Sequence, residues 1–265
     1  MKKTVVCTKI GNMKDPDPSK RGTVACMEMP DLVMGPHDVK IKVAYCAICG
    51  SDPHIVGGIF PDRVVPFGLG HEVSGVVVEV GSEVAKDVKP GDRVAGNFLS
   101  FCGGCYFCQN GMQQFCTNAK DEASSPGMSE YVVWDEGQVW KLPDDVTLKE
   151  ACLLEPTSIT TRIVDKSNMK IGHTVAIQGG GPIGLLTLQL MKMRGATKLT
   201  MIEPSAARRE LALKMGADFV VDPINQNVVE ECSKITNGLG FDCVVEVSGF
   251  APAANIPLAI SACGG

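Results

Sequence analysis

Short apolar runs rich in β-branched residues, separated by turns that contain Gly and Pro, dominate the first part of the chain. Lys89-Pro90-Gly91-Asp92 is one of these turns, and short runs bounded by such turns indicate strands. The strands expected from the pattern are residues 39–43, 73–80, 131–134 and 139–142. Together they predict a compact, partly barrel-like β domain.

The pattern changes after Pro156, where strand-length apolar runs alternate with helix-length segments. The expected strands are residues 174–178, 198–202, 219–221 and 241–246, and the expected helices are residues 181–193, 206–215, 225–236 and 251–262. Such alternation makes a parallel sheet covered by helices. We therefore predict two domains, residues 1–156 and 157–265, linked by a helix over residues 157–164.

The strand count of the second domain bears on its extent. A doubly wound dinucleotide-binding sheet is built from two halves of three strands each. We count four strands before the chain ends at Cys263-Gly264-Gly265. The sequence therefore predicts an α/β domain with a doubly wound parallel sheet that is truncated at its C-terminus.

Composition and charge narrow the class of partner. The chain has 265 residues, of which 45% are hydrophobic, and this is enough to bury the cores of two domains. The net charge of −5, without a basic patch, disfavours nucleic acid and anionic membranes as partners. No apolar run approaches the length of a membrane span, and no cleavage site follows Met1-Lys2-Lys3. We expect a cytoplasmic protein that acts on a small molecule.

Four of the twelve cysteines form a cluster with the spacing Cys-x2-Cys-x2-Cys-x7-Cys. They are Cys102, Cys105, Cys108 and Cys116. Four thiolates satisfy tetrahedral zinc and leave no open coordination position, so this site is predicted to be structural. It would brace a lobe over about residues 98–120. An iron–sulfur cluster is the alternative, because closely spaced cysteines also bind those.

A second metal site is predicted from two separate turns. Cys49 supplies a thiolate, and Gly70-His71-Glu72 supplies an imidazole and a carboxylate. A catalytic zinc needs three protein ligands and one exchangeable position. Of the four histidines, only His54 and His71 fall inside these motifs.

Polar residues beside Cys49 suggest a path for a proton. The hydroxyl of Ser51 could contact the oxygen of a bound alcohol and pass its proton towards His54 and solvent. Asp52 is expected to orient the ligand imidazole. Ser and Asp also favour turns and caps, which is the simpler interpretation of Ser51 and Asp52.

The run Gly179-Gly180-Gly181-Pro182-Ile183-Gly184 follows an apolar strand and opens a helix. In that context the glycines allow a tight turn, and the helix N-terminus faces a pyrophosphate. Glu203 lies nineteen positions after Gly184, where an acid binds the ribose hydroxyls of NAD. Glu203 favours NAD over NADP, whereas the neighbouring Arg208 and Arg209 keep NADP open as an alternative.

Taken together, these motifs resemble the zinc-containing medium-chain dehydrogenases. The motifs are Cys49-Gly50-Ser51-Asp52-Pro53-His54, Gly70-His71-Glu72, the four-cysteine cluster and the run from Gly179 to Gly184. The resemblance covers essentially the whole chain. It implies a chaperonin-10-like (GroES-like) catalytic domain, a Rossmann domain, two zinc ions per chain and NAD. It also implies that Ile183 packs at the cofactor and that Arg208 lies near its adenosine end.

The third ligand of the catalytic zinc distinguishes branches of this family. Liver-type alcohol dehydrogenases have a second cysteine where this chain reads Leu153-Leu154-Glu155-Pro156. With Glu155 at this place, the chain resembles the sorbitol, threonine and butanediol dehydrogenase branch. In that branch the Glu that matches Glu155 or the one that matches Glu72 completes the zinc shell. Both carboxylates remain open as ligands, and a plain acid at a helix N-terminus is a third interpretation of Glu155.

The predicted function is transfer of hydride between a secondary alcohol and NAD by a zinc-dependent oxidoreductase. The alcohol would be a polyol, a diol or a hydroxy amino acid. One alternative is a zinc-binding and nucleotide-binding protein without catalysis, and another is an NADP-dependent alcohol or aldehyde reductase. The resemblance also implies that this protein, when full length, is a homo-oligomer, either a dimer or a tetramer.

Overall fold

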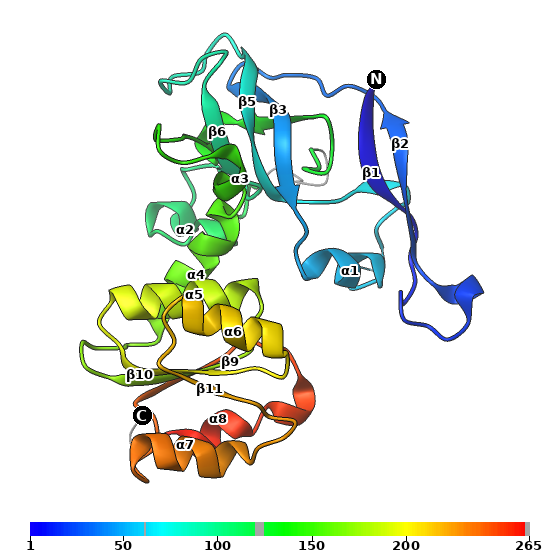
Figure 1. The fold of residues 1–265 in the computed structure, drawn as a ribbon. Helices are drawn as coiled ribbons and strands as arrows, with labels where there is room; N and C mark the ends of the chain where they lie inside the picture. The colour runs from blue at the N-terminus through cyan, green and yellow to red at the C-terminus, as the bar shows by residue number, and fades with distance from the viewer. Residues whose placement is uncertain (61, 120–124, 263–265) are drawn as a thin grey trace. The chain divides into compact units, whose positions relative to one another are not determined.

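A computed structural model describes residues 1–60, 62–119 and 125–262 (Figure 1). The chain forms two compact units, Met1–Glu155 and Pro156–Gly265. Their boundary lies one residue before the one predicted from the sequence. Among the described residues, every helix is too short or too polar to cross a lipid bilayer.

The first unit is built on a five-stranded antiparallel sheet with the order β7-β3-β5-β6-β8. Its strands are β3 (Asp38–Ala47), β5 (Glu72–Val80), β6 (Arg93–Asn97), β7 (Tyr131–Asp135) and β8 (Val139–Lys141). Alternate side chains of these strands point to one face, where Val39, Ile41, Val73, Val77 and Trp134 form the core. The register between β3 and β5 shifts twice, and such bulges bend and twist a sheet. The four strands predicted in this region are all present.

A smaller sheet with the order β2-β1-β4 was not predicted from the sequence. It contains β1 (Lys2–Lys9), β2 (Thr23–Met29) and β4 (Phe67–Gly68). β2 is exposed along nearly its whole length, so its residues carry no alternating pattern that would indicate a strand. The sheet matters for function because Cys7 and Phe67 pack with Val56 and Leu69, which holds the chain just before His71.

Short helices complete the first unit. They are α1 (Ser51–Val56), α2 (Tyr106–Gln109) and α3 (Leu148–Ala151), together with the 3-10 turns η1 (Pro18–Lys20), η2 (Gln113–Phe115) and η4 (Glu136–Gln138). α3 begins with a capping box in which the side chains of Thr147 and Glu150 bind each other's backbone amides.

The second unit is a four-stranded parallel sheet with the order β11-β10-β9-β12. The strands are β9 (Thr174–Gln178), β10 (Thr197–Ile202), β11 (Phe219–Val221) and β12 (Cys243–Glu246). The chain runs outward from β9 to β11 and then returns to pair β12 on the other side of β9. This reversal is the switch point of a doubly wound fold, so the predicted fold class is confirmed.

Helices cover both faces of this sheet (Figure 1). They are α4 (Leu154–Lys166), α5 (Pro182–Met193), α6 (Ala206–Lys214), α7 (Val228–Thr236) and α8 (Ile256–Ile260), with the 3-10 turn η5 (Ala251–Ala253). Val175 and Ile177 of β9 belong to one core cluster and Ala176 to the other, because successive side chains of a strand point to opposite faces.

One predicted helix is wrong in its extent. Residues 251–262 form η5 and α8 rather than a continuous helix. Pro252 and Pro257 explain the break, because proline lacks an amide hydrogen and disfavours helical geometry in the residue before it.

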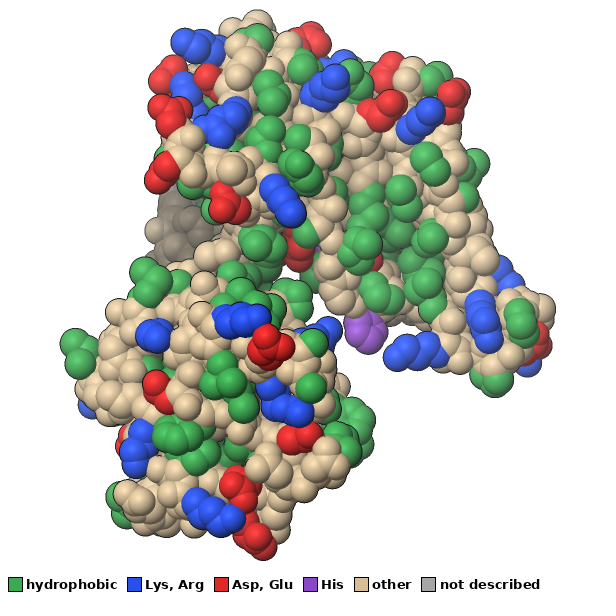
Figure 2. Space-filling model, in the orientation of Figure 1, with side chains coloured by type: hydrophobic (Ala, Val, Ile, Leu, Met, Phe, Trp, Pro, Cys, Tyr) green, Lys and Arg blue, Asp and Glu red, His purple; other side chains and the backbone are tan. Residues whose placement is uncertain are grey.

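Charged side chains of both signs are intermixed on the face of the molecule in Figure 2. That face carries no large patch of one sign, in keeping with the net charge of −5. The face in Figure 2 shows no basic stripe of the kind that binds nucleic acid.

Candidate active site

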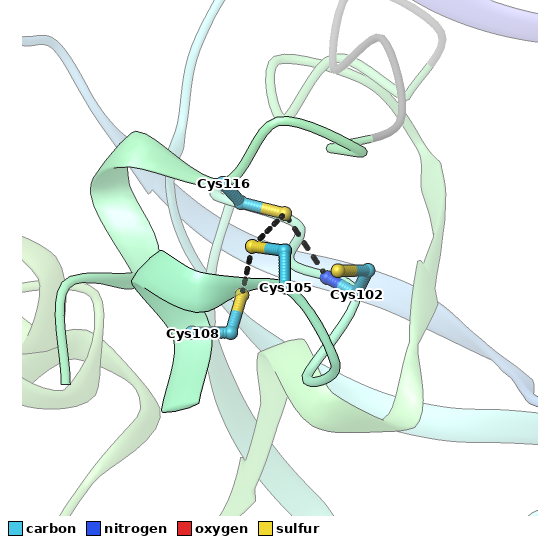
Figure 3. Close-up of side chains that lie close together, drawn as sticks. All are labelled: Cys102, Cys105, Cys108 and Cys116. Carbon is cyan, nitrogen blue, oxygen red and sulfur yellow. Dashed lines mark hydrogen bonds between the residues drawn. The ribbon is translucent and has the colours of Figure 1, made fainter. Parts of the chain in front are cut away.

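The four clustered cysteines converge in a small lobe of the first unit (Figure 3). Cys105 precedes α2, Cys108 lies within it, and Cys102 and Cys116 flank it on either side in sequence. The four sulfur atoms lie within 4.8 Å of one another. Cys105 Sγ is 3.5 Å from Cys108 Sγ and 3.9 Å from Cys116 Sγ. Zinc bound tetrahedrally about 2.3 Å from each sulfur would separate the sulfurs by about 3.8 Å, so the cluster fits zinc.

Backbone geometry preorganises this cluster. Gly103 and Gly111 have φ angles of 70° and 72°, a left-handed conformation that glycine adopts readily. Hydrogen bonds from the backbone amides of Cys108 and Thr117 lower the pKa of the Cys105 thiol to about 6. Desolvation raises the pKa of the Cys108 thiol to about 12. Amide donors directed at a thiol favour its thiolate, which is the form that binds metal.

The second predicted set also comes together. The ligand atoms of Cys49, His71 and Glu72 lie within 4.8 Å of one another. Sheet register explains their approach, because Ala47 near the end of β3 pairs with Glu72 at the start of β5. This pairing brings the turn after β3 beside the turn before β5. Thiolate, imidazole and carboxylate together fit a catalytic zinc site.

Asp52 holds the two ligand-bearing turns in place. Its carboxylate is buried and accepts hydrogen bonds from the backbone amides of Cys49 at 2.9 Å and Gly70 at 3.3 Å. The first amide belongs to the candidate ligand Cys49, and the second belongs to Gly70, the residue before His71. Asp52 therefore positions both sides of the cluster through the backbone, and its charge also acts to raise the pKa of His71.

Electrostatics couple the three candidate ligands. The interaction with His71 is the largest influence on Cys49 and lowers the pKa of its thiol, against the effect of burial. Burial acts to lower the pKa of His71, but the Cys49 thiolate, Asp52 and Glu155 together outweigh burial, and the pKa is raised. Burial also raises the pKa of Glu72. Thiolate and imidazole thus stabilise each other's charged forms.

Glu155 lies close to this cluster at the start of α4. Its side chain is buried, and burial raises its pKa while the charge of His71 acts in the opposite direction. The compact group of three ligand atoms includes Glu72 and not Glu155. The two carboxylates therefore occupy different places in the site, with Glu72 nearer to Cys49 and His71.

Ser51 and His54 lie on α1, immediately after Cys49. A hydrogen bond from the Ser51 hydroxyl is among the influences that lower the pKa of Cys49. His54 is exposed and lies three positions further along the helix, a spacing that puts two side chains on the same face. Ser51 thus lies beside a candidate ligand and His54 at the solvent.

The second unit contains a cavity of about 480 Å³ at the carboxyl ends of its strands. The residues that line it are Gln178, Gly179, Gly181, Ile202, Glu203, Pro204, Arg208, Pro223, Ile224, Val247, Ser248, Phe250, Pro252, Ala253 and Ile256. They follow β9, β10, β11 and β12, the place where doubly wound sheets bind ligands. Pro182, Ile183 and Gly184 lie in the first turn of α5 and are not among the residues that line this cavity.

Gly179 and Gly184 of the β9–α5 turn cannot carry a Cβ atom without a collision, whereas Gly181 can. A Cβ atom on Gly184 would lie 1.8 Å from the carbonyl oxygen of Gly179. A Cβ on Gly179 would lie 2.7 Å from the amide nitrogen of Ser248. At Gly181, which caps α5, a Cβ would meet nothing within 4 Å. The open side of this cradle fits a phosphate-bearing cofactor at a helix N-terminus.

The predicted cofactor-binding acid, Glu203, and the two neighbouring arginines have different partners. Glu203 is buried and accepts hydrogen bonds from the amides of Gly180 at 2.6 Å and Ser205 at 2.8 Å. Arg209 forms an ion pair of 2.9 Å with Asp222. Arg208 lines the cavity. Asp222 was not predicted as a functional residue, although its position just after β11 is a place where such residues occur.

Comparison with known proteins defines the family. Residues 35–144 match the alcohol dehydrogenase GroES-like domain, and residues 182–265 match the zinc-binding dehydrogenase domain. The chain belongs to the zinc-dependent dehydrogenases of the alcohol dehydrogenase superfamily. The predicted family and the GroES-like and Rossmann folds are thereby confirmed.

Individual relatives are polyol dehydrogenases by name. The chain is 39% identical over 225 residues to D-arabitol-phosphate dehydrogenase of Enterococcus avium, covering 83% of this chain and 64% of that one. It is 35% identical over 237 residues to sorbitol dehydrogenase of Halalkalibacterium halodurans, covering 88% and 68%. This chain therefore spans about two thirds of the length of these relatives.

A solved structure from Sinorhizobium meliloti 1021, bound to NADP, superimposes with a TM-score of 0.86 at 36% identity. The match covers 100% of this chain and 75% of that one. That related protein therefore binds a nicotinamide cofactor.

Proposed function

We propose that this protein oxidises a secondary alcohol with NAD at a zinc centre held by Cys49, His71 and Glu72. The main support for this proposal is that the ligand atoms of these three residues lie within 4.8 Å of one another. The four cysteines of the lobe would hold a second, structural zinc. Three ligands of mixed type leave a coordination position free for substrate, whereas four thiolates do not.

The chemistry divides between the bound groups and the chain. Zinc supplies Lewis acidity that makes an alcohol hydroxyl acidic near neutral pH, and NAD supplies the hydride acceptor. Ser51 Oγ accepts the hydroxyl proton of the substrate and passes its own proton to His54, which exchanges it with solvent. Two observations support this proton path. Ser51 contacts the candidate ligand Cys49, and His54 is exposed to solvent.

The proposed substrates carry a second polar group beside the reacting carbinol. Glu72 and Glu155 give the site two buried carboxylates, which suit a polyol, a diol or a hydroxy amino acid better than a simple apolar alcohol. The names of the arabitol-phosphate and sorbitol dehydrogenases that match this chain support the same class.

NAD is the proposed cofactor because of the charges at the adenosine end of the cavity. The buried carboxylate of Glu203 would repel a 2′-phosphate and accept hydrogen bonds from ribose hydroxyls. Arg209, the neighbouring cation, is paired with Asp222 and also donates to the carbonyl oxygens of Glu203 and Pro204. NADP remains the second candidate, favoured by the NADP bound in the related structure and by Arg208 in the cavity wall.

The proposal extends to the whole protein. We propose that it is cytoplasmic, acts on a small molecule and assembles into a dimer or tetramer. Light scattering of the purified protein tests the assembly, and a monomer at micromolar concentration would contradict it.

The test of function uses zinc-loaded protein with NAD or NADP and a set of alcohols. Sorbitol, L-threonine and 2,3-butanediol are compared with ethanol, and NADH formation is followed by absorbance. We expect faster reduction of NAD than of NADP and oxidation of at least one of the three polar alcohols. Protein that binds zinc and NAD yet oxidises none of them would instead be a binding protein without catalysis.

A further inference from the structure

A small cavity of about 80 Å³ opens beside the Cys49–His71–Glu72 cluster in the first unit. Its wall includes Asp52, Arg63, His71, Phe98 and Ser125. His71 therefore belongs both to the proposed metal site and to this cavity. The cavity is therefore connected to the proposed metal site through His71.

Arg63 is the one arginine or lysine among the residues that line this cavity. The centre of its guanidinium lies 5.2 Å from the ring centroid of Phe60 and 5.4 Å from that of Phe67. Contacts of this kind hold a guanidinium through its faces. They leave the N–H groups at its edge available to other partners.

The one acid among the lining residues, Asp52, already accepts hydrogen bonds from the backbone. Asp52 uses its two carboxylate oxygens to accept hydrogen bonds from the amides of Cys49 and Gly70. Within residues 1–60, 62–119 and 125–262, no carboxylate forms a salt bridge with Arg63. Among the residues that the structure describes, this half-buried guanidinium, which lies over two aromatic rings, thus lines the cavity without a carboxylate counterion.

We propose that Arg63 is an anion subsite of the active centre, so that the substrate carries a carboxylate or phosphate a few bonds from the reacting hydroxyl. The inference rests on the proposed function for the place of the reacting carbon. Guanidinium binds both anions through two parallel N–H···O bonds. The cavity is small, so the anionic group and the carbinol must be close together in the substrate.

The test measures binding rather than turnover, by isothermal titration of the zinc-loaded protein. Two matched pairs of probes separate the sources of negative charge. L-threonine is compared with L-threoninol, in which a hydroxymethyl group replaces the carboxylate, and D-sorbitol 6-phosphate is compared with D-sorbitol. In the wild-type protein we expect the member of at least one pair that carries the carboxylate or phosphate to bind about tenfold or more tightly than the member that lacks it. The pair that shows the difference identifies carboxylate or phosphate as the preferred anion.

Substitutions at Arg63 then assign the difference to this side chain. Arg63→Met should abolish the preference for the probe with the anionic group and leave binding of the probe without that group within about twofold. Arg63→Lys should retain part of it, because lysine keeps the charge without the planar fork. Lys42→Met, which removes an exposed cation of the same unit, should leave the preference intact. Circular dichroism verifies that each variant is folded, and Arg63→Gln replaces the methionine variant if that one is not.

Three results would overturn the anion subsite. They are equal binding of both members of each pair by the wild-type protein, no binding of any probe, and a preference that persists in the methionine and glutamine variants. Failure of the proposed function is a separate outcome. It would be seen as an Arg63-dependent preference for the probe with the anionic group, without any reduction of NAD.

Discussion

The two candidate metal sites of this chain bring their ligand atoms together in opposite ways. In the lobe, four thiols within 4.8 Å come from one short stretch of sequence, residues 102–116. In the active site, Cys49 and His71 are 22 positions apart and meet because β3 pairs with β5. The first site is made by local turns and the second by sheet register.

This difference has a chemical counterpart. Four identical soft ligands close the coordination sphere of zinc, whereas one thiolate, one imidazole and one carboxylate leave it open. The open cluster also needs Asp52 to fix its two turns. Loss of a residue in the lobe should therefore affect stability, and loss of a residue in the open cluster should affect zinc occupancy and activity.

The largest effect is expected from His71→Ala. Loss of this ligand should reduce the zinc content from two to about one per chain and lower the rate of alcohol oxidation by at least about 10³-fold, because Lewis-acid catalysis contributes several kcal/mol. Cys152→Ser is the matched control, since Cys152 is buried nearby but donates to the carbonyl oxygen of Lys149. Elemental analysis and NADH formation measure both quantities. Retention of two zinc ions by the alanine variant would contradict the assignment.

The next effect tests the lobe. Cys108→Ser should lower the free energy of unfolding of the first unit by about 4 kcal/mol or more, because loss of a structural metal ranks among the most destabilising changes. Both tryptophans, Trp134 and Trp140, belong to the first unit, so urea unfolding followed by tryptophan fluorescence reports on that unit. Cys26→Ser, at an exposed thiol, should change the value by less than about 0.5 kcal/mol. Equal stability of the two variants would show that the lobe does not depend on its metal.

A smaller effect, which distinguishes the two metal sites, is expected from a substitution at Asp52. Asp52→Asn removes the negative charge and leaves one carbonyl oxygen to accept from two amides. We expect zinc affinity of the open site to fall by about 10-fold to 100-fold, as is typical for residues that orient metal ligands. Competition with a chromogenic chelator measures the affinity of each site. Zinc in the lobe should be unaffected, and the exposed Asp145→Asn serves as the control. Equal loss at both sites would mean that Asp52 acts on the whole unit.

The smallest effect concerns the turn geometry of the lobe. Gly103→Ala should destabilise the first unit by about 1 kcal/mol, because the φ angle of 70° is left-handed and costs energy for any residue with a Cβ. Gly104 is the control, since a Cβ there meets nothing within 4 Å and its φ angle is not in that range. Tryptophan fluorescence during urea unfolding compares the two alanine variants. A neutral Gly103→Ala would indicate that the lobe tolerates a shift of its backbone.

Elements with a strong local pattern were predicted well. The strands over Val73 and Val132 and the glycine turn before α5 appear where expected, because alternation and glycine spacing are properties of a few neighbouring residues. β1 and β2 were missed, since β2 is exposed and shows no alternation. The helix predicted over residues 251–262 is interrupted because Pro252 and Pro257 lie within it.

The sequence by itself determined the donor types, the family and the order of the two folds, because cysteine spacing, glycine turns and hydrophobic periodicity are local in the chain. Only the tertiary structure decided that Glu72 rather than Glu155 joins Cys49 and His71 in the compact group. It also decided that Arg209 pairs with Asp222 and that Arg63 faces the cavity beside His71. Each of these depends on strand register or on packing between distant segments, and contacts of that kind leave no periodic signal in the sequence.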